Sequence, residues 1–339
     1  MSIHVQYYQR RAGPAHFSME RVFDAVRKAL PADIAAETHP CPFQSRRILR
    51  RILNIVDAPF HQRDLNHIEG DVHYLALSLK KRQTILTIHD CVALRFKKGF
   101  NRKFLLWFWF WLPLRRVAAI TVISKFTRDE VLRYTGCNPK IMHVIPDPVP
   151  SGFVAWPQEF RAQQPVILQV GTAPHNKNIC RVAEALQGIR CHLDIVGRLT
   201  EEQREALETN RIQYTERWNL SDQQVIESYR ACDMVVFASI YEGFGMPIIE
   251  ANATGRPVVT SNVGAMQEVA GSAACLVDPF DCASIRDGIL RVTNDADYRR
   301  HLVEQGFENI KRFQADVIAA QYALLYREVG QKVMRNADS

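Results

Sequence analysis

Length, composition and charge set the first limits on this chain. Its 339 residues are 47% hydrophobic, which suits two domain cores and excludes a largely disordered chain. The first 155 residues carry 24 Lys and Arg but 12 Asp and Glu, whereas the remainder carries 19 and 24. A basic first half attracts an anionic partner such as a membrane surface, a phosphorylated substrate or nucleic acid, or it is simply a solvated face.

The eight cysteines are scattered, with no CxxC pair and no Cys/His cluster at metal spacing. This pattern predicts buried thiols, a reducing cytosol and no metal site. The first residues have no apolar signal core, and no apolar run reaches the roughly 18 residues that a membrane span needs. We therefore expect a cytoplasmic protein.

Short β-branched runs alternate with amphipathic helices along the first half, which is typical of parallel sheets with helices on both faces. The predicted strands are Ile3–Gln6, Ile34–Glu37, Leu65–His67, Thr84–Ile88, Ala119–Ile123 and Met142–Ile145. The predicted helices are Met19–Leu30, Arg46–Ile55, Val72–Leu79 and Lys125–Tyr134, the last of them capped by Ser124.

A proline-rich segment, Pro146–Pro165, has no periodicity and predicts an interdomain linker. A second series follows, with predicted strands at Val166–Val170, Cys191–Val196, Ile212–Tyr214, Met234–Phe237, Pro257–Thr260 and Cys275–Val277. Ser221–Gln224 reads as a capping box that opens a helix, and the tail from Ala283 onwards reads as helical.

The fold class is therefore α/β, with two Rossmann-like doubly wound domains. We expect an N-terminal domain at residues 1–155, a second domain at 156–312, and a C-terminal helix at 313–339 that packs back on the first domain. Doubly wound domains bind ligands at the carboxyl ends of their strands, so two of them facing each other form a cleft.

The most informative segment is Tyr241–Glu250, which follows the apolar run Met234–Phe237. Gly243 and Gly245 let the backbone bend tightly and approach a ligand. Pro247 suits the first turn of a helix, where free N–H groups and the helix dipole bind anions. A nucleotide diphosphate is the natural occupant.

The spacing Glu242-x7-Glu250 resembles the motif of the retaining family-4 glycosyltransferases, which have the GT-B fold. The resemblance is strong across residues 165–310 and visible in the first half. It implies that Glu242 holds the transferred sugar, that Glu250 holds the ribose, and that the stretch Gly243, Phe244 and Gly245 binds the donor. The alternative for either carboxylate alone is a surface glutamate.

A strand also ends at the loop that contains Gly171 and Thr172, and Lys177 stands at the start of the next helix. A lysine there neutralises a departing diphosphate, and the resemblance implies that role for Lys177. Many family members carry an arginine where this chain has Thr172. Arg198 is a candidate substitute, as is a basic residue of the other domain.

Other positions are matched less closely. His89, at the end of a strand, stands where the family often has a histidine near donor sugar and acceptor. Gly13 matches a glycine-rich loop, and Tyr214 opens the segment where the family seats the base. His67 and Glu69 are further candidates for the acceptor side. Each histidine has the alternative of a hydrogen-bonded structural residue.

The segment Phe104–Leu112 is aromatic on all sides, too short to span a membrane, and flanked by basic residues. We interpret it as an insert that binds a membrane surface, with Arg46, Arg47, Arg50 and Arg51 adding to the patch. The alternative is a buried helix between domains. The formal DxD sequence Asp295–Asp297 lies between helices, so we interpret it as a solvated helix start and expect metal-independent chemistry.

The resemblance implies a retaining glycosyltransferase that moves a sugar from a nucleotide-diphosphate donor, a GDP- or UDP-sugar, without a cofactor. We expect a glycan or lipid-linked acceptor at the inner face of the cytoplasmic membrane, in polysaccharide or O-antigen assembly. The alternatives are a nucleotide-sugar epimerase of the same fold and a non-catalytic partner subunit. Nucleic-acid binding is not expected, because no motif for it accompanies the charge.

Overall fold

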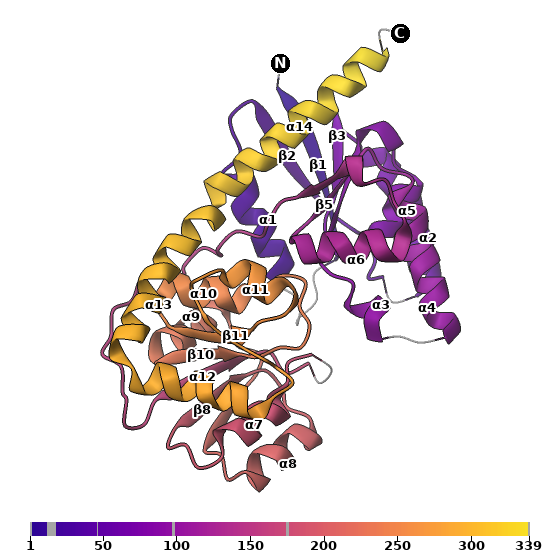
Figure 1. Cartoon of the computed structure of the whole chain (residues 1–339). Helices are drawn as coiled ribbons and strands as arrows, with labels where there is room; N and C mark the ends of the chain where they lie inside the picture. Colours follow the sequence, from indigo (N-terminus) through magenta and orange to yellow (C-terminus); the bar gives the residue numbers. More distant parts are fainter. Residues whose placement is uncertain (1, 12–17, 46, 97–98, 174–175, 338–339) are drawn as a thin grey trace. The chain divides into compact units, whose positions relative to one another are not determined.

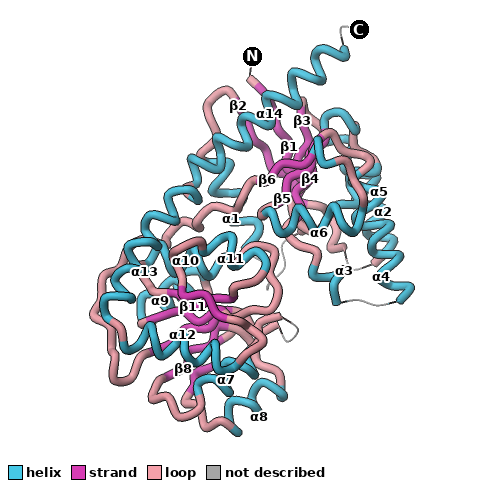
Figure 2. Tube along the Cα trace, viewed as in Figure 1, coloured by secondary structure: helices cyan, strands magenta, loops and turns pink. Residues whose placement is uncertain are grey.

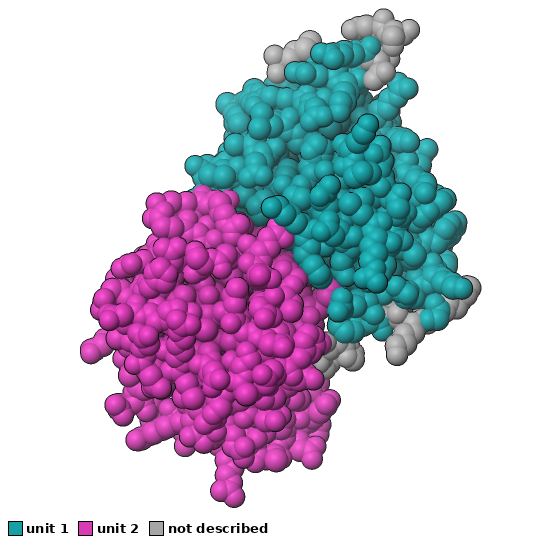
Figure 3. Space-filling view, in the orientation of Figure 1, with its two compact units in different colours: residues 1–148, 314–339 teal, residues 149–313 magenta. Residues whose placement is uncertain are grey.

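The chain forms two compact units, each built on its own sheet (Figure 1). The computed structural model describes residues 2–11, 18–45, 47–96, 99–173 and 176–337. Residues 1–148 and 314–339 make up the first unit, and residues 149–313 make up the second (Figure 3). The chain therefore crosses between the units once inside the proline-rich segment and once before the last helix.

The first unit contains a parallel sheet in the order β2-β1-β3-β4-β5-β6 (Figure 2). Its strands are β1 (Ile3–Gln9), β2 (Ile34–Pro40), β3 (Leu65–Ile68), β4 (Thr84–Ile88), β5 (Ala119–Val122) and β6 (Met142–Val144). Its helices are α1 (Ser18–Lys28), α2 (Ile48–Asp57), α3 (Val92–Phe96), α4 (Gly99–Leu105), α5 (Leu112–Leu114), α6 (Lys125–Thr135) and α14 (Ala315–Ala337). Shorter turns are η1 (Ala58–His61), η2 (His73–Leu77), η3 (Lys81–Gln83), η4 (Leu106–Trp111) and η5 (Pro139–Ile141).

Alternation along the strands decides what each face of this sheet packs against, because successive side chains point to opposite faces. Tyr8, Ile68 and Leu86 belong to a core that η2, η4 and α5 close. The neighbouring residues Tyr7 and His67 face the last helix, α14, which lies along the other face together with α1 (Figure 1).

The second unit contains a parallel sheet in the order β12-β11-β10-β7-β8-β9. Its strands are β7 (Val166–Val170), β8 (His192–Val196), β9 (Tyr214–Arg217), β10 (Met234–Phe237), β11 (Val258–Ser261) and β12 (Cys275–Val277). Its helices are α7 (Ile179–Leu186), α8 (Glu201–Thr209), α9 (Asp222–Ala231), α10 (Met246–Thr254), α11 (Gly264–Ala270), α12 (Cys282–Asn294) and α13 (Ala296–Asn309), followed by the turn η6 (Ile310–Phe313). Helices α7, α8 and α12 close the core on one face, and α9 and α10 contact the other.

Most predicted elements are confirmed within a few residues, and two need correction. The helix predicted at Val72–Leu79 is the 3₁₀ turn η2, whose side chains are mostly buried. The strand predicted at Ile212–Tyr214 is β9, which only begins at Tyr214. Apolar Ile212 misplaced that prediction, because β9 is an edge strand of polar residues whose Arg217 pairs with Asp194.

The aromatic segment is helical but irregular. Its central turn, η4, is a π-helix, which α5 follows with Pro113 in its first turn. Proline has no N–H to bond the carbonyl of Trp109 four residues earlier, and the buried His73 ring lies 2.9 Å from that oxygen through Nδ1. No helix among the described residues combines the length and the hydropathy needed to cross a bilayer.

Candidate functional site

Strand order indicates where the second unit binds a ligand. The chain runs outward from β7 to β8 and β9 in one direction, and from β10 to β11 and β12 in the other. The order therefore reverses between β7 and β10, and open α/β sheets bind ligands outside the carboxyl ends of the strands at such a point. The two segments that follow β7 and β10 are the two singled out in the sequence.

An ion pair joins these two segments. Lys177 Nζ lies 2.9 Å from Glu242 Oε1, and each side chain is about 15% exposed. The same ammonium group lies 4.5 Å from the centre of the Phe237 ring, on which it makes a cation–π contact. The structure thus brings the predicted phosphate-binding lysine and the predicted sugar-binding carboxylate into direct contact.

Two asparagines fix this arrangement, and the sequence analysis did not single them out. The amide of Asn176 donates to the Tyr241 carbonyl at 3.1 Å and to Glu242 Oε1 at 3.3 Å. Asn178 adopts a left-handed conformation with φ of 59°, and its buried amide donates to Ala238 O at 2.9 Å. The sequence signal that could have revealed them is an asparagine on each side of a lysine just after a strand. Asparagine also tolerates the left-handed conformation that Asn178 adopts.

Gly171 makes room for the lysine. It has φ of 86°, and a Cβ there would lie 2.7 Å from Lys177 Cε. Any other residue would therefore be strained in the backbone and would displace the Lys177 side chain. Gly171 acts by leaving space, which explains why the chain requires glycine at this point.

Helix α10 begins at the site. Gly245 is its N-cap with φ of 115°, and Pro247 lies in its first turn, as predicted. Among the described residues no side chain caps this helix. Pro247 has no N–H and the Ile248 N–H bonds the Gly245 carbonyl, so the N–H groups ahead of Pro247 and the positive end of the helix dipole are what this helix start presents to an anion. Phe244 is buried and packs edge-on against Phe313 at 5.5 Å, so its side chain anchors the loop. Gly243 is also buried.

Glu250 lies one turn into α10 and is partly exposed. Its Oε2 accepts a hydrogen bond of 2.5 Å from the hydroxyl of Tyr229, a buried residue of α9. Burial, followed by the charge of Glu250, raises the pKa of Tyr229 well above its ordinary value, so this hydroxyl remains a donor. One carboxylate oxygen is thereby oriented, and Tyr229 is a positioning residue that the sequence pattern did not reveal.

Thr172 and Arg198 join the loops after β7 and β8. The Thr172 hydroxyl donates to the Arg198 carbonyl at 2.6 Å. Gly197 allows this contact, because a Cβ there would lie 2.6 Å from Thr172 Cγ2. The Arg198 side chain is exposed. That Arg198 replaces the charge missing at Thr172 stays a prediction.

Tyr214 is not at this edge of the sheet. It is the first residue of β9 and pairs with Leu193, whereas Arg217 pairs with Val196 at the carboxyl end. The prediction for Tyr214 rested on a strand ending there, and the strand begins there instead. Trp218, which is half-exposed, follows the carboxyl end of β9 and is the aromatic residue at that edge.

In the first unit, His89 follows β4. Its Nδ1 lies 3.8 Å from Asp147 Oδ2, and both side chains are largely buried. Burial lowers the pKa of His89, but Asp147 together with the charges of Asp90 and Asp71 outweighs it, so the pKa is raised above its ordinary 6.5. Within the described part of the chain, the buried Nε2 atom has no hydrogen-bond partner. The ring is therefore oriented by Asp147 and retains one nitrogen for a ligand.

Burial shifts the pKa values of Glu69 and His67 in opposite directions. Arg27 donates to Glu69 Oε1 at 3.1 Å, yet burial dominates and raises the pKa of Glu69 to about 8. His67 is fully buried between the hydroxyls of Tyr326 and Thr87, each 2.7 Å from a ring nitrogen. Burial lowers the pKa of His67 to about 3, so it is a neutral core residue and does not line an acceptor site. Gly13 lies outside the described residues.

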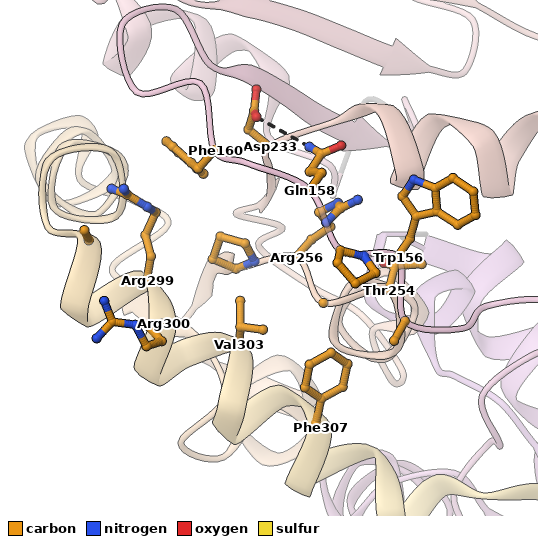
Figure 4. A pocket seen from close by; sticks show the side chains of 15 residues that line it. Trp156, Gln158, Phe160, Asp233, Thr254, Arg256, Arg299, Arg300, Val303 and Phe307 are labelled. Atoms are coloured by element: carbon orange, nitrogen blue, oxygen red, sulfur yellow. Dashed lines mark hydrogen bonds between the residues drawn. The ribbon is translucent and has the colours of Figure 1, made fainter.

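A separate pocket of about 320 Å³ lies at the opposite end of the second sheet (Figure 4). It contains Asp233 and Pro257, which directly precede β10 and β11, and is walled by Phe160 and Phe307. Its polar groups are used internally, since Asp233 pairs with Arg161. Because it lies at the amino ends of the strands, it is remote from the site.

The DxD sequence is a helix start, as predicted. Asp295 caps α13 by accepting from Tyr298 N at 2.9 Å, and the exposed Asp297 pairs with Arg300.

Two family models match the chain and together cover most of it. The model described as Glycosyl transferases group 1 matches residues 154–309, and the model described as Glycosyltransferase Family 4 matches residues 6–152. The division between the matches falls in the same proline-rich segment as the division between the two units.

Curated relatives are similar over shorter lengths. An O-antigen chain mannosyltransferase B of Escherichia coli is 36% identical over 106 residues, which are 31% of this chain and 28% of that protein. An MMP alpha-(1->4)-mannosyltransferase of Mycolicibacterium hassiacum is 25% identical over 232 residues, 65% of this chain and 56% of that protein. The matches thus span from about a quarter to just over half of these relatives.

Solved structures match the whole fold at low identity. Sucrose-phosphate synthase from Thermosynechococcus elongatus has a TM-score of 0.79 at 18% identity, over 96% of this chain and 99% of that one. Anabaena HepE in complex with UDP and glucose has a TM-score of 0.77 at 15% identity, over 96% and 100%. The predicted GT-B fold with two Rossmann-like sheets is confirmed.

Proposed function

The chain belongs to glycosyltransferase family 4, the group 1 glycosyl transferases, and on this premise we propose that it moves a sugar from a nucleotide-diphosphate donor to an acceptor hydroxyl. The observation that carries the proposal is the Lys177–Glu242 ion pair where the strand order reverses, beside the start of α10. A cation, a helix start and a carboxylate are the groups that a diphosphate and a sugar require.

The ion pair is the resting state of the donor site. When a donor enters, its diphosphate replaces Glu242 as the ion-pair partner of Lys177. Glu242 then accepts hydrogen bonds from sugar hydroxyls. Glu250, held by Tyr229, accepts hydrogen bonds from the ribose. Gly171 keeps Lys177 in place, and the first turn of α10 shares the phosphate charge.

Transfer proceeds with retention and on one face of the sugar. The bond from the anomeric carbon to the diphosphate oxygen breaks, and the acceptor oxygen bonds to the same face. The acceptor proton passes to the departing phosphate oxygen, so no protein base is required. Lys177 stabilises the charge that develops on the leaving group. No step needs a metal ion, because the cation and the helix start supply the neutralising charge.

The donor is a GDP- or UDP-hexose, and mannose is the leading sugar because the two curated relatives described above are mannosyltransferases. A thermal-shift screen in EDTA with UDP, GDP and ADP tests the site. Stabilisation by one diphosphate, reduced in Glu250→Ala, supports it and selects the nucleotide. Absence of any shift for the wild type contradicts it. Release of an altered sugar without an acceptor would indicate an epimerase instead.

We further propose that the acceptor is a lipid-linked glycan and that the first unit binds an anionic bilayer. Part of the Phe104–Leu112 segment is buried, as Phe110 shows, while Phe104 and Trp107 are 46% and 50% exposed. Helix α2 adds a face of exposed apolar residues: Ile48, Leu49, Ile52, Leu53 and Val56. The Arg51 guanidinium lies 4.9 Å from the Trp109 ring and joins the two elements into one surface.

Basic residues match an anionic headgroup layer: Arg47 at the N-cap of α2, Arg50 and Arg51 within it, and Arg102 and Lys103 of α4. Arg46 lies outside the described residues. Co-sedimentation with phosphatidylglycerol vesicles should be strong for the wild type and weak for Leu49→Ser with Trp107→Ser. Trp218→Ser is the matched control, because Trp218 of the second unit is equally exposed at 50%. Equal loss of binding in the control contradicts this surface.

A further inference from the structure

Three side chains converge at one end of the first sheet, outside the site described above. His39 lies near the carboxyl end of β2, Asp57 is the last residue of α2, and His61 is the last residue of η1. Their nitrogen and oxygen ligand atoms all lie within 4.8 Å of one another. His39 Nε2 is 2.7 Å from Asp57 Oδ2, and His61 Nε2 is 3.4 Å from Asp57 Oδ1.

The two imidazole rings stack on each other beside the carboxylate. Their planes are 21° apart with centroids 3.7 Å from each other, and both present Nε2 to Asp57. Asp57 and His61 are four residues apart, which places them on one side of a helical turn. His39 comes from a different element, so the sequence spacing, which predicts no metal site, did not reveal this cluster.

Two imidazole nitrogens and one carboxylate oxygen are a donor set that zinc accepts, with a water molecule as the fourth ligand. Ligand atoms about 2.0–2.1 Å from a tetrahedral zinc ion are about 3.3 Å from one another. His61 and Asp57 are at that separation, 3.4 Å, and His39 is nearer to Asp57, at 2.7 Å. The side chains of His39, Asp57 and His61 are 20%, 32% and 40% exposed, so an ion has access from solvent. The rival arrangement is a hydrogen-bonded cluster in which Asp57 accepts from both rings.

We propose that His39, Asp57 and His61 bind a zinc ion. The ion joins the end of α2 and the turn η1 to the edge strand β2. Two strands, β1 and β3, separate β2 from β4 and His89 in the sheet order, so it is a structural site and takes no part in sugar transfer. The proposal stands whether or not the chain is a glycosyltransferase.

The test is a zinc titration of the full chain, stripped with EDTA and followed by calorimetry. The wild type should bind one equivalent of zinc. Loss of a partner behind a metal ligand already weakens binding about 10–100-fold, so His39→Gln and His61→Gln should each lose at least tenfold. His192→Gln is the matched control, since His192 is a histidine of the second unit that bonds Thr215.

Two further measurements keep the result unambiguous. Circular dichroism must show that the variants remain folded, and Asp57→Asn should repeat the loss of affinity in a variant of nearly unchanged shape. Cobalt in place of zinc should give tetrahedral absorption without a thiolate charge-transfer band. Equal zinc affinity in the wild type and His61→Gln, no binding by the wild type, or a thiolate band would each overturn the proposal.

Discussion

Ionisable residues of the two units are held in two different states. In the second unit, Lys177 and Glu242 face each other with part of each side chain exposed, so their charges are available to an incoming ligand. In the first unit, His67 is fully buried and neutral, and hydroxyls occupy both of its ring nitrogens. A polar residue near a strand end therefore marks a binding site only when the fold leaves it accessible to a ligand.

The largest effect should come from the charged pair. Lys177→Met should lower kcat/KM for sugar transfer about 10²–10³-fold, because the leaving diphosphate loses the cation that stabilises it. The measurement is initial-rate transfer from the donor that the diphosphate screen identifies. Lys311→Met, which removes an exposed lysine paired with Glu308, should leave the rate unchanged.

A double variant sharpens this result. Lys177→Met with Glu242→Gln should be as inactive as the single variants, because each group serves the same transition state. If the double variant recovers activity, the pair is only a structural ion pair and the assignment of the donor site fails.

The next effect should appear in nucleotide affinity. Glu250→Gln should weaken binding of the diphosphate about tenfold or more, because hydrogen bonds to a charged acceptor contribute about 1.5–3 kcal/mol. Tyr229→Phe should cause a smaller loss, since it removes the donor that orients the carboxylate but keeps the charge. Titration calorimetry measures both, and a greater loss in Tyr229→Phe would contradict the ribose role.

A change in the buried cluster of Tyr7, His67 and Tyr326 should affect stability alone. The Tyr326 hydroxyl contacts Tyr7 at 2.6 Å and His67 at 2.7 Å, and all three residues are fully buried. Tyr326→Phe leaves those partners unsatisfied, at a cost of about 1–3 kcal/mol. Hydrogen exchange should become faster in α14 and β1 and remain unchanged in β7 and β10. Tyr134→Phe, which keeps the ring under Arg102, is the control.

Most of the candidate donor site was predictable because its residues are close in sequence. Glu242, Gly245 and Glu250 lie in one strand-loop-helix segment. Because the carboxyl ends of parallel strands lie at the same edge of a sheet, that segment is expected near Lys177. The βα alternation predicted both sheets for the same reason, since each element carries its own periodicity.

The site features that the sequence did not reveal depend on contacts between elements that are distant in the chain. Asp147 and His89 are far apart in the chain, and Tyr229 reaches Glu250 from another helix. His67 was predicted as a site residue because no local pattern indicates that Tyr326, 259 residues later, forms a hydrogen bond with its ring. Tyr214 was misplaced for another reason: β9 is an edge strand whose polar residues bond polar residues of β8 and α8, so hydrophobicity gave the wrong end.

The most gradual effect is a pH dependence of stability that arises from the buried His67. The folded state holds the pKa of His67 at about 3, below its ordinary 6.5, so the unfolded chain takes up a proton first as pH falls. Stability from this group is therefore complete above pH 6.5 and lost toward pH 3, at up to about 1.4 kcal/mol per pH unit. Glu69 acts in the opposite sense, because its pKa of about 8 lets the folded state bind a proton between pH 8 and 4.5.

The two contributions oppose each other above pH 4.5, so the comparison with His67→Gln isolates the histidine. That variant keeps hydrogen-bonding groups but does not titrate there. Three of the five tryptophans are in the aromatic segment, so urea unfolding followed by fluorescence in a Trp156→Phe, Trp218→Phe background reports the first unit. The wild type should lose its advantage over His67→Gln as pH falls from 6.5 to 4, and a constant difference would mean that His67 is not held neutral by the fold.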